Sequence, residues 1–445
     1  MKTWRYIATL VLCALSLSAW SQDFARLSEH SIMGTARYIG MGGAMTAIGG
    51  DPSAAIDNPA GLGLYRHTEA LLSFGLQFDR THQTGMPTYG TTAFYIPQAS
   101  LVLNAWTGKE GDEGVLFHNF LFSYQRMHSF FRTTRSSSAN DASLGALLGT
   151  LTEVPWDIPF CTDPYASANS LRLDERGYVD QFVFDWAMNI SNRWFVGAGL
   201  QIQSLRMSSD ANYEEIFAQT NASGKHMYNE NISSLLFTGA SCTFSAGAIY
   251  RPTGWLRLGV GIQTPSLGSV RTYSAGKLYA LTDSLRPSTA PNMGGEPDKS
   301  FHLPLHLSTS VAFQIGAYGM VALQYDYMHA KQMDDLHSLR AGFEVIPVLG
   351  LYINGGYAVE SSFKKFNYVV PVDPKFERQD TYFQNIRWSQ YASVAVGYRG
   401  TYMLVQAAYQ YRWQHIDQWA HENAQPYDIH ADTHRIVVTI GWHRY

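Results

Sequence analysis

The stretch that decides the fold is TYMLVQAAYQYRWQ, residues 401–414. Its odd-numbered positions from Met403 to Trp413 are apolar or aromatic, whereas its even-numbered positions include Gln410 and Arg412. A period of two is typical of a β-strand whose two faces meet different environments. The face that ends in tyrosine and tryptophan suits lipid, and the polar face suits a lumen. The stretch therefore predicts one strand of a membrane β-barrel.

The same alternation recurs along most of the chain after residue 68. A large soluble β-sandwich also alternates, but its apolar face would be interior and would seldom end in so many tyrosines and tryptophans. We therefore expect an all-β fold, a transmembrane antiparallel barrel of about 14 strands, with 255–281 as one strand bent at Pro265. The expected strands are 68–80, 92–107, 115–132, 178–191, 194–207, 235–251, 255–281, 303–315, 318–330, 337–347, 349–360, 389–399, 401–414 and 433–445.

Short and long connections alternate between these strands. Short turns belong to the periplasmic end of an outer-membrane barrel and long loops to the exterior, so both ends of the barrel chain should be periplasmic. The expected short turns are 191–193, 251–254, 316–319, 347–350 and 399–400.

Composition narrows the classes of function. The formal net charge is -4 and 15% of residues are charged, which argues against a nucleic-acid partner. No segment after the N-terminus approaches the roughly 18–20 apolar residues of a membrane helix. After the N-terminal segment the chain contains two cysteines, Cys161 and Cys242. Two cysteines are too few for a disulfide framework or a cysteine metal cluster, although these two could form one disulfide. We expect no cofactor and no resident metal.

The N-terminus indicates export. Lys2 and Arg5 precede an apolar run over 7–19, and Ala19-Trp20-Ser21 forms a small-x-small cleavage site. We assign 1–21 as a signal peptide, 22–67 as an N-terminal plug or hatch and 68–445 as the barrel.

The segment before the first strand is rich in small residues. It contains Gly-Met-Gly-Gly-Ala at 40–44, Asp-Pro-Ser-Ala-Ala at 51–55, and the run Asn58, Pro59, Ala60 and Gly61. A nucleotide-binding loop is a poor interpretation, because no strand precedes the glycines and no Gly-Lys-Ser/Thr follows. Small residues instead let a backbone pass close to the strand walls of a barrel.

On these motifs the chain resembles the FadL/TodX outer-membrane transport proteins, a family with many relatives labelled as hemin receptors. The resemblance implies a monomeric 14-stranded barrel in the outer membrane, closed by a hatch, that takes up small hydrophobic molecules such as long-chain fatty acids or aromatic compounds. The ligand would leave when the hatch shifts or through a gap in the wall. The implied partners are outer-membrane lipids, the hydrophobic ligand and, during biogenesis, the barrel-assembly machinery.

Candidate residues for ligand capture lie in the long loops. In 143–160 the first four leucines are spaced for one face of a helix, so this apolar loop is either a ligand platform or a lid packed on its neighbours. A second loop, 208–234, supplies two aromatic candidates. The candidates are Leu144, Leu147, Leu148, Leu151, Trp156, Phe160, Tyr213 and Phe217.

Charged residues on the lumen face are expected to form ion pairs that hold the hatch rather than a catalytic site. They are Asp185, Arg257, Asp326, Arg340, Glu344, Arg399 and Arg412.

Three alternatives to passive uptake stay open. A hemin receptor would use histidines as iron ligands, and His415, His421, His430 and His434 surround one exterior loop. A barrel could also be a docking partner in secretion or surface assembly. An outer-membrane lipase would need a serine, a histidine and an acid on one outer wall, and no such arrangement stands out, so we expect no enzyme.

Overall fold

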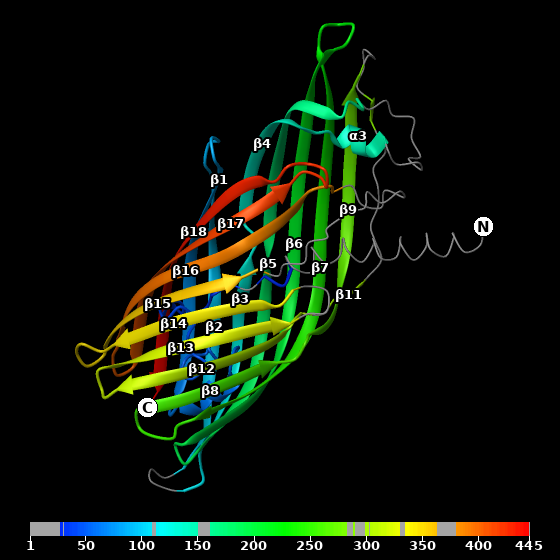
Figure 1. The fold of residues 1–445 in the computed structure, drawn as a ribbon. Coiled ribbons are helices and arrows are strands. Elements are labelled where there is room, and N and C mark those ends of the chain that lie inside the picture. Colours follow the sequence, from blue (N-terminus) through cyan, green and yellow to red (C-terminus); the bar gives the residue numbers. More distant parts are fainter. Residues whose placement is uncertain are drawn as a thin grey trace, which may run out of the picture.

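A computed structural model of the chain describes residues 27–29, 31–108, 113–149, 161–282, 288–289, 299–301, 303–329, 334–362 and 380–444. Its antiparallel strands form a closed barrel, in which β1 (Thr68–Gln83) pairs with β2 (Tyr89–Thr107) on one side and β18 (Tyr427–Arg444) on the other (Figure 1). The expected signal peptide lies outside the described residues.

Fourteen strands make the wall, as the alternation predicts. Three of them are interrupted, one of them as β10, β11 and β12, which pair with β8 or β9. β3 (Val115–Ser129) and β4 (Arg132–Ala142) both pair with β5, and β8 (Leu256–Gln263) and β9 (Leu267–Leu281) both pair with β7. The bend at Pro265 therefore falls where it is expected. The other strands are β5 (Tyr165–Ile190), β6 (Trp194–Thr220), β7 (His226–Tyr250), β10 (Ser288–Thr289), β11 (Lys299–Phe301), β12 (Leu305–Ile315), β13 (Gly319–His329), β14 (Leu336–Val345), β15 (Leu351–Ser361), β16 (Phe383–Arg399) and β17 (Met403–Trp419).

The two faces of the wall have opposite character. On β17, Met403 and Val405 point outward and are about half exposed, whereas Gln410 and Arg412 point inward and are buried. Apolar side chains cover the outside of most strands in the same way, which is the pattern of a barrel embedded in lipid. No helix among the described residues is long and apolar enough to cross a membrane.

The connections divide the barrel into two rims. Thr68 pairs with Arg444, so the first strand begins and the last strand ends at the same rim, where the expected short turns also lie. At one of these turns Ser191 and Asn192 both have positive φ, 53° and 55°, which suits a tight hairpin. We call this end the short-turn rim and the opposite end the long-loop rim.

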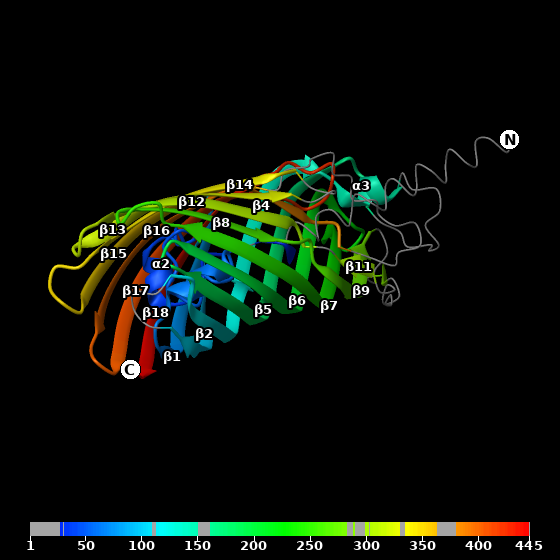
Figure 2. The same ribbon diagram turned by 90° about the horizontal axis from the view of Figure 1, so that it is seen from below.

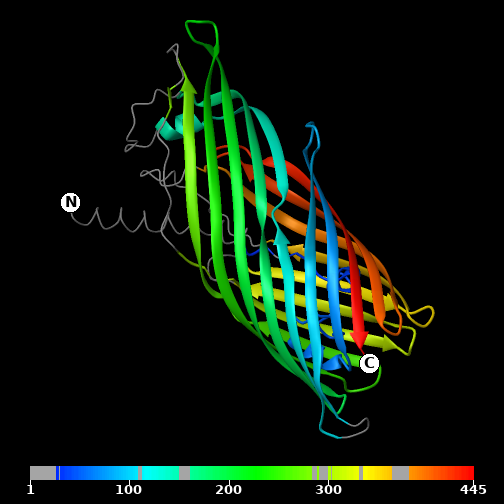
Figure 3. The ribbon, with the colours of Figure 1, turned by 180° about the vertical axis from the view of Figure 1, so that it is seen from behind.

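The prediction that 208–234 is a loop is wrong. β6 continues to Thr220 and β7 begins at His226, so most of the region is a strand hairpin that extends past the rest of the barrel (Figure 3). Asn212 and Glu214 point outward there and are exposed. Because both faces of this part of the hairpin carry polar residues, the apolar and polar alternation of the membrane region stops.

Residues 31–67 lie inside the barrel (Figure 2). The segment forms a short helix, α2 (Ala36–Gly40), and a 3-10 helix, η1 (Pro59–Leu64). α2 packs against β15 to β18, and η1 packs against β3 and β5 to β7, so the segment spans the lumen from wall to wall. We call 31–67 the lumen segment.

Cys161 and Cys242 are not joined. Cys161 is buried on the lumen side near the long-loop rim, whereas Cys242 is partly exposed on the wall, and both are free thiols.

Candidate ligand pathway in the lumen

Buried ion pairs fix the lumen segment to the wall. Arg37 Nε lies 2.7 Å from Glu344 Oε2, and Asn354 Nδ2 donates to the same oxygen at 2.8 Å. On a neighbouring side, Arg340 Nη1 lies 3.3 Å from Asp57 Oδ2. Each pair joins the segment to β14.

These buried charges shift the pKa values of one another. Burial opposes the positive charge of Arg37, but the Glu344 carboxylate outweighs that effect and raises the pKa of Arg37. Burial raises the pKa of the Asp57 carboxyl, and the Arg340 guanidinium acts in the opposite direction. Arg340 also lies 3.0 Å from Asp326, so one guanidinium serves two buried carboxylates.

The seven charged residues that the sequence predicts on the lumen face make different contacts. Four contact the N-terminal region: Arg340 and Glu344 through the pairs above, Arg257 by donating to Ile48 O at 3.0 Å, and Arg412 through an ion pair with Glu29. Asp326 acts through Arg340, and Arg399 pairs with Glu69 on the wall. Asp185 is buried, and neither carboxylate oxygen has a hydrogen-bond partner among the described residues.

The Asn58 to Gly61 motif has a structural explanation. Asn58 Oδ1 accepts from Ala60 N at 3.1 Å and so caps the 3-10 helix that Pro59 begins. Its Nδ2 donates to Thr46 O at 2.9 Å and to Ala248 O of β7 at 3.3 Å. One side chain thus orders the segment internally and joins it to the wall.

Glycines of the wall allow the backbone of the lumen segment to lie directly against the strands. A Cβ on Gly261 of β8 would lie 1.9 Å from Asp57 O, and one on Gly356 of β15 would lie 2.1 Å from Gly42 N. Backbone meets backbone at both positions, so a larger side chain would displace the lumen segment.

An apolar cluster fills the lumen at the long-loop rim. α3 (Leu144–Gly149) lies over this end of the barrel (Figure 1), and its Leu144 and Leu147 pack into the cluster with inward-facing residues of the long strands. We call this the mouth cluster. Its members are Leu144, Leu147, Leu171, Leu173, Ala211, Tyr213, Leu278, Tyr382, Ile416, Ala420, Ala424, Tyr427, Ile429 and Ala431.

The capture candidates are distributed unevenly around this cluster. Leu144, Leu147 and Tyr213 belong to it, and Phe217 lies in a smaller neighbouring cluster with Cys161. The Leu148 side chain and residues Leu151, Trp156 and Phe160 lie outside the described part of the structure. Most of the other members of the mouth cluster lie at strand ends, and the sequence did not indicate them as capture candidates.

Glu215 holds α3 in place, a role that no sequence motif indicates. Its buried carboxylate accepts from Ser143 Oγ at 2.9 Å, from Leu144 N at 2.8 Å and from Gly145 N at 3.0 Å. Carboxylates stabilise the exposed N–H groups at the start of a helix.

Replacing Glu215 by alanine should release α3. Two buried N–H groups would lose their acceptor, at about 1–3 kcal/mol each. We expect faster hydrogen exchange at Leu144 and Gly145, measured by mass spectrometry, whereas alanine at the exposed neighbour Glu214 should change nothing. Equal exchange in the two variants would contradict this role.

A second apolar cluster lies deeper in the barrel. We call it the middle cluster, and its members are Leu27, Phe130, Val179, Leu205, Met207, Leu235, Phe237, Val270, Met328 and Leu336. Beside it is a cavity lined by both polar and apolar side chains, among them Glu29, Asp79, His128, Arg412 and Arg435. Three apolar regions therefore follow one another: the mouth cluster, the middle cluster and the packed lumen segment.

Solved structures with this architecture are known. The structure is similar to that of a FadL homologue of Pseudomonas aeruginosa, with 13% sequence identity, a TM-score of 0.58, and coverage of 93% of this chain and 99% of that one. The chain has the FadL-type fold. It is also similar to the toluene transporter TodX of P. putida (13% identity, TM-score 0.52, 93% and 98% covered) and to the toluene transporter TbuX of Ralstonia pickettii (14%, 0.50, 93% and 99%). No family model matches the sequence, and no curated protein matches it significantly.

The wall of this FadL-type barrel has a break in its hydrogen-bond ladder. β2 pairs with β3 only from Gln98 onward. Its residues 89–95 pair with β1 alone among the described strands, and residues 96 and 97 pair with neither neighbour. Pro97, which has no N–H to donate, lies where the ladder ends. Opposite it, Phe130 and Phe131 separate β3 from β4, and Phe130 belongs to the middle cluster.

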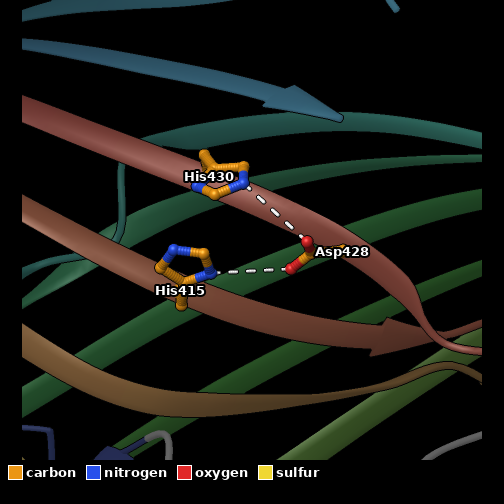
Figure 4. Close-up of side chains that lie close together, drawn as sticks. All are labelled: His415, Asp428 and His430. Atoms are coloured by element: carbon orange, nitrogen blue, oxygen red, sulfur yellow. Dashed lines mark ion pairs between the residues drawn. The ribbon is translucent and has the colours of Figure 1, made fainter. Parts of the chain in front are cut away.

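The four histidines of the hemin hypothesis do not meet in one place. His421 is buried inside, where its ring bonds Ala142 O at 3.0 Å, and His434 points outward and bonds Tyr409 Oη at 2.8 Å. Only His415 and His430 lie together, on the outer wall (Figure 4). The geometry gives no pair of imidazoles facing each other across a lumen pocket.

Proposed function

We propose that this protein is an outer-membrane channel for the passive uptake of small hydrophobic molecules, a class that includes long-chain fatty acids and aromatic hydrocarbons. The observation that carries the proposal is the succession of apolar clusters inside a barrel whose wall is otherwise polar inward. A water-filled pore is lined by polar side chains, so buried leucines and phenylalanines along the path argue against such a pore.

The physical basis is transfer out of water. An apolar solute gains about 25 cal/mol for each Å² of surface that it buries. The mouth cluster offers such a surface at the long-loop rim, and the middle cluster offers a second one further in. A solute could move between them down its concentration gradient, without an energy source.

The lumen segment makes a straight passage to the short-turn rim unfavourable, because it spans the barrel and is tied to several strands. The break beside Pro97 supports a lateral exit. Phe130 connects this break to the middle cluster, and the outward-facing Phe94 next to it is exposed toward the lipid side. In this proposal the hydrophobic molecule enters the bilayer through the wall.

The similar structures are named as a FadL homologue and as toluene transporters. These names agree with a hydrophobic cargo for a barrel of this shape, and they describe those proteins.

A charge placed in the mouth cluster should prevent capture. Leu173 is fully buried there, so Leu173→Asp would put a carboxylate into the first apolar surface that the ligand meets. We expect that mass spectrometry of organic extracts will find a hydrophobic molecule bound to the wild-type barrel and much less bound to Leu173→Asp. Ser170→Asp is the matched control, because Ser170 lies on the same strand but is exposed. Equal loading of Leu173→Asp and Ser170→Asp would contradict capture at this cluster.

A further inference from the structure

Three potential metal ligands converge on the outer wall at the long-loop rim. His415 of β17 lies in register with His430 of β18, and Asp428 is two residues before His430 on the same face. One ligand atom from each of the three side chains can be chosen so that all lie within 4.8 Å of one another. Figure 4 shows the carboxylate between the two imidazoles.

The distances suit a small divalent cation. His415 Nδ1 is 3.5 Å from Asp428 Oδ1, and His430 Nε2 is 3.8 Å from Asp428 Oδ2. Ligands at about 2.0 Å from a tetrahedral zinc ion are about 3.3 Å apart, so small side-chain movements would complete the geometry. Two imidazoles with one carboxylate form a donor set that favours zinc and its neighbours over magnesium or calcium.

The ligand atoms are available for coordination. His415 Nδ1 is buried and has no hydrogen-bond partner among the described residues. Asp417, which is in register with Asp428, is already held by Arg387 through bonds of 2.8 and 2.6 Å. Asp428 is therefore the carboxylate that is left to bind an ion.

Neighbouring rings hold the two imidazoles in position. His82 of β1 stacks on His430 at 5.1 Å, and Trp388 of β16 packs against His415 at 5.2 Å. Side chains fixed by packing lose less freedom when a ligand binds. On β17 the outward-facing tyrosines and tryptophan at 409–413 come just before His415, so the group lies closer to the long-loop rim than these rings.

We propose that His415, Asp428 and His430 bind one zinc-class divalent cation, which joins β17 to β18 at the long-loop rim and keeps one coordination position open to water. No ligand spacing along the chain marks this group, because His415 and His430 lie on different strands and meet only through their register. The site is on the outside of the barrel, so it is separate from the proposed path of the hydrophobic ligand.

Calorimetric titration of the full barrel in detergent tests this site. The protein should carry an affinity tag without histidines, be stripped with a chelator and be titrated with Zn²⁺ in the presence of excess Mg²⁺. We expect one Zn²⁺ to bind per chain, and His415→Gln or His430→Gln to weaken binding by about tenfold or more. His434→Gln is the matched control, because His434 points outward on β18 but bonds Tyr409 instead. Co²⁺ should give the intense visible absorption of a tetrahedral site in the wild type and in His434→Gln only.

Three results would overturn the proposal. They are the absence of Zn²⁺ binding by the wild type, unchanged binding by the double variant His415→Gln/His430→Gln, and loss of binding in excess Mg²⁺, which would indicate a diffuse acidic surface. Heat-modifiable migration on a gel establishes that every variant is a folded barrel, so weak binding cannot be ascribed to misfolding.

Discussion

Deleting residues 23–62 should open the barrel to the passage of ions. The lumen segment packs from α2 against β15 to β18 and from η1 against β5 to β7, so its removal leaves the inside of fourteen strands without this filling. Barrels somewhat larger than this one hold an aqueous channel. We expect planar-bilayer recordings to change from near-silent traces to porin-like conductance.

Folding must be checked in the same preparation, and heat-modifiable gel migration serves that purpose. A folded deletion variant that conducts no more than the wild type would show that the lumen segment is not the barrier. The two apolar clusters would then have to close the lumen by themselves.

Replacing Arg340 by methionine should loosen the lumen segment without deleting it. The guanidinium lies between Asp57 and Asp326, both buried. Its loss leaves Asp57 without its ion-pair partner, and Asp326 with the His306 imidazole, 3.4 Å away, as its remaining ion-pair partner among the described residues. Removing one member of a buried ion pair costs about 3–5 kcal/mol. We expect the lumen segment to detach from the wall at a lower temperature, measured as the temperature at which a protease begins to cleave within 31–67. We also expect intermittent ion conductance.

The control is Arg399→Met. Arg399 pairs with Glu69, but its side chain is 41% exposed and neither residue belongs to the lumen segment. Because Arg399 is exposed to solvent, although Glu69 is buried, its loss should cost less than the loss of the fully buried Arg340. The triple variant Arg340→Met, Asp57→Asn, Asp326→Asn should recover much of the protease resistance. Equal effects of Arg340→Met and Arg399→Met would contradict the anchoring role.

The barrel could be predicted from the sequence because lipid imposes a local rule. Every strand within the bilayer must present an apolar face outward, and on β17 this rule is visible from Met403 to Trp413 without knowledge of any partner strand. Where the strands pass beyond the bilayer the rule no longer applies. Asn212 and Glu214 of β6 are polar although they point outward. The alternation therefore does not predict the outer part of the hairpin that β6 forms with β7.

The contacts of the lumen segment could be predicted only where they are local. Asn58 caps a helix that begins at the next residue, so its motif can be read along the chain. Arg37 and Glu344 are 307 positions apart, and no spacing in the sequence connects them. The same holds for His415 and His430, which meet only because the β17 and β18 hairpin fixes their register.

Transport of a hydrophobic probe by the purified barrel in lipid vesicles is the direct test of the proposal that this protein takes up hydrophobic molecules. Vesicles that contain the wild-type chain, the Leu173→Asp variant or the Ser170→Asp control should be given a radiolabelled long-chain fatty acid and, in parallel, a radiolabelled monoaromatic hydrocarbon. A trapped binding protein or enzyme that captures each probe inside the vesicle would register its arrival. We expect at least one probe to arrive faster in vesicles with the wild-type or Ser170→Asp barrel than in protein-free vesicles, and we expect Leu173→Asp to lose this gain. Arrival at the protein-free rate for both probes with the wild-type barrel would contradict the proposal.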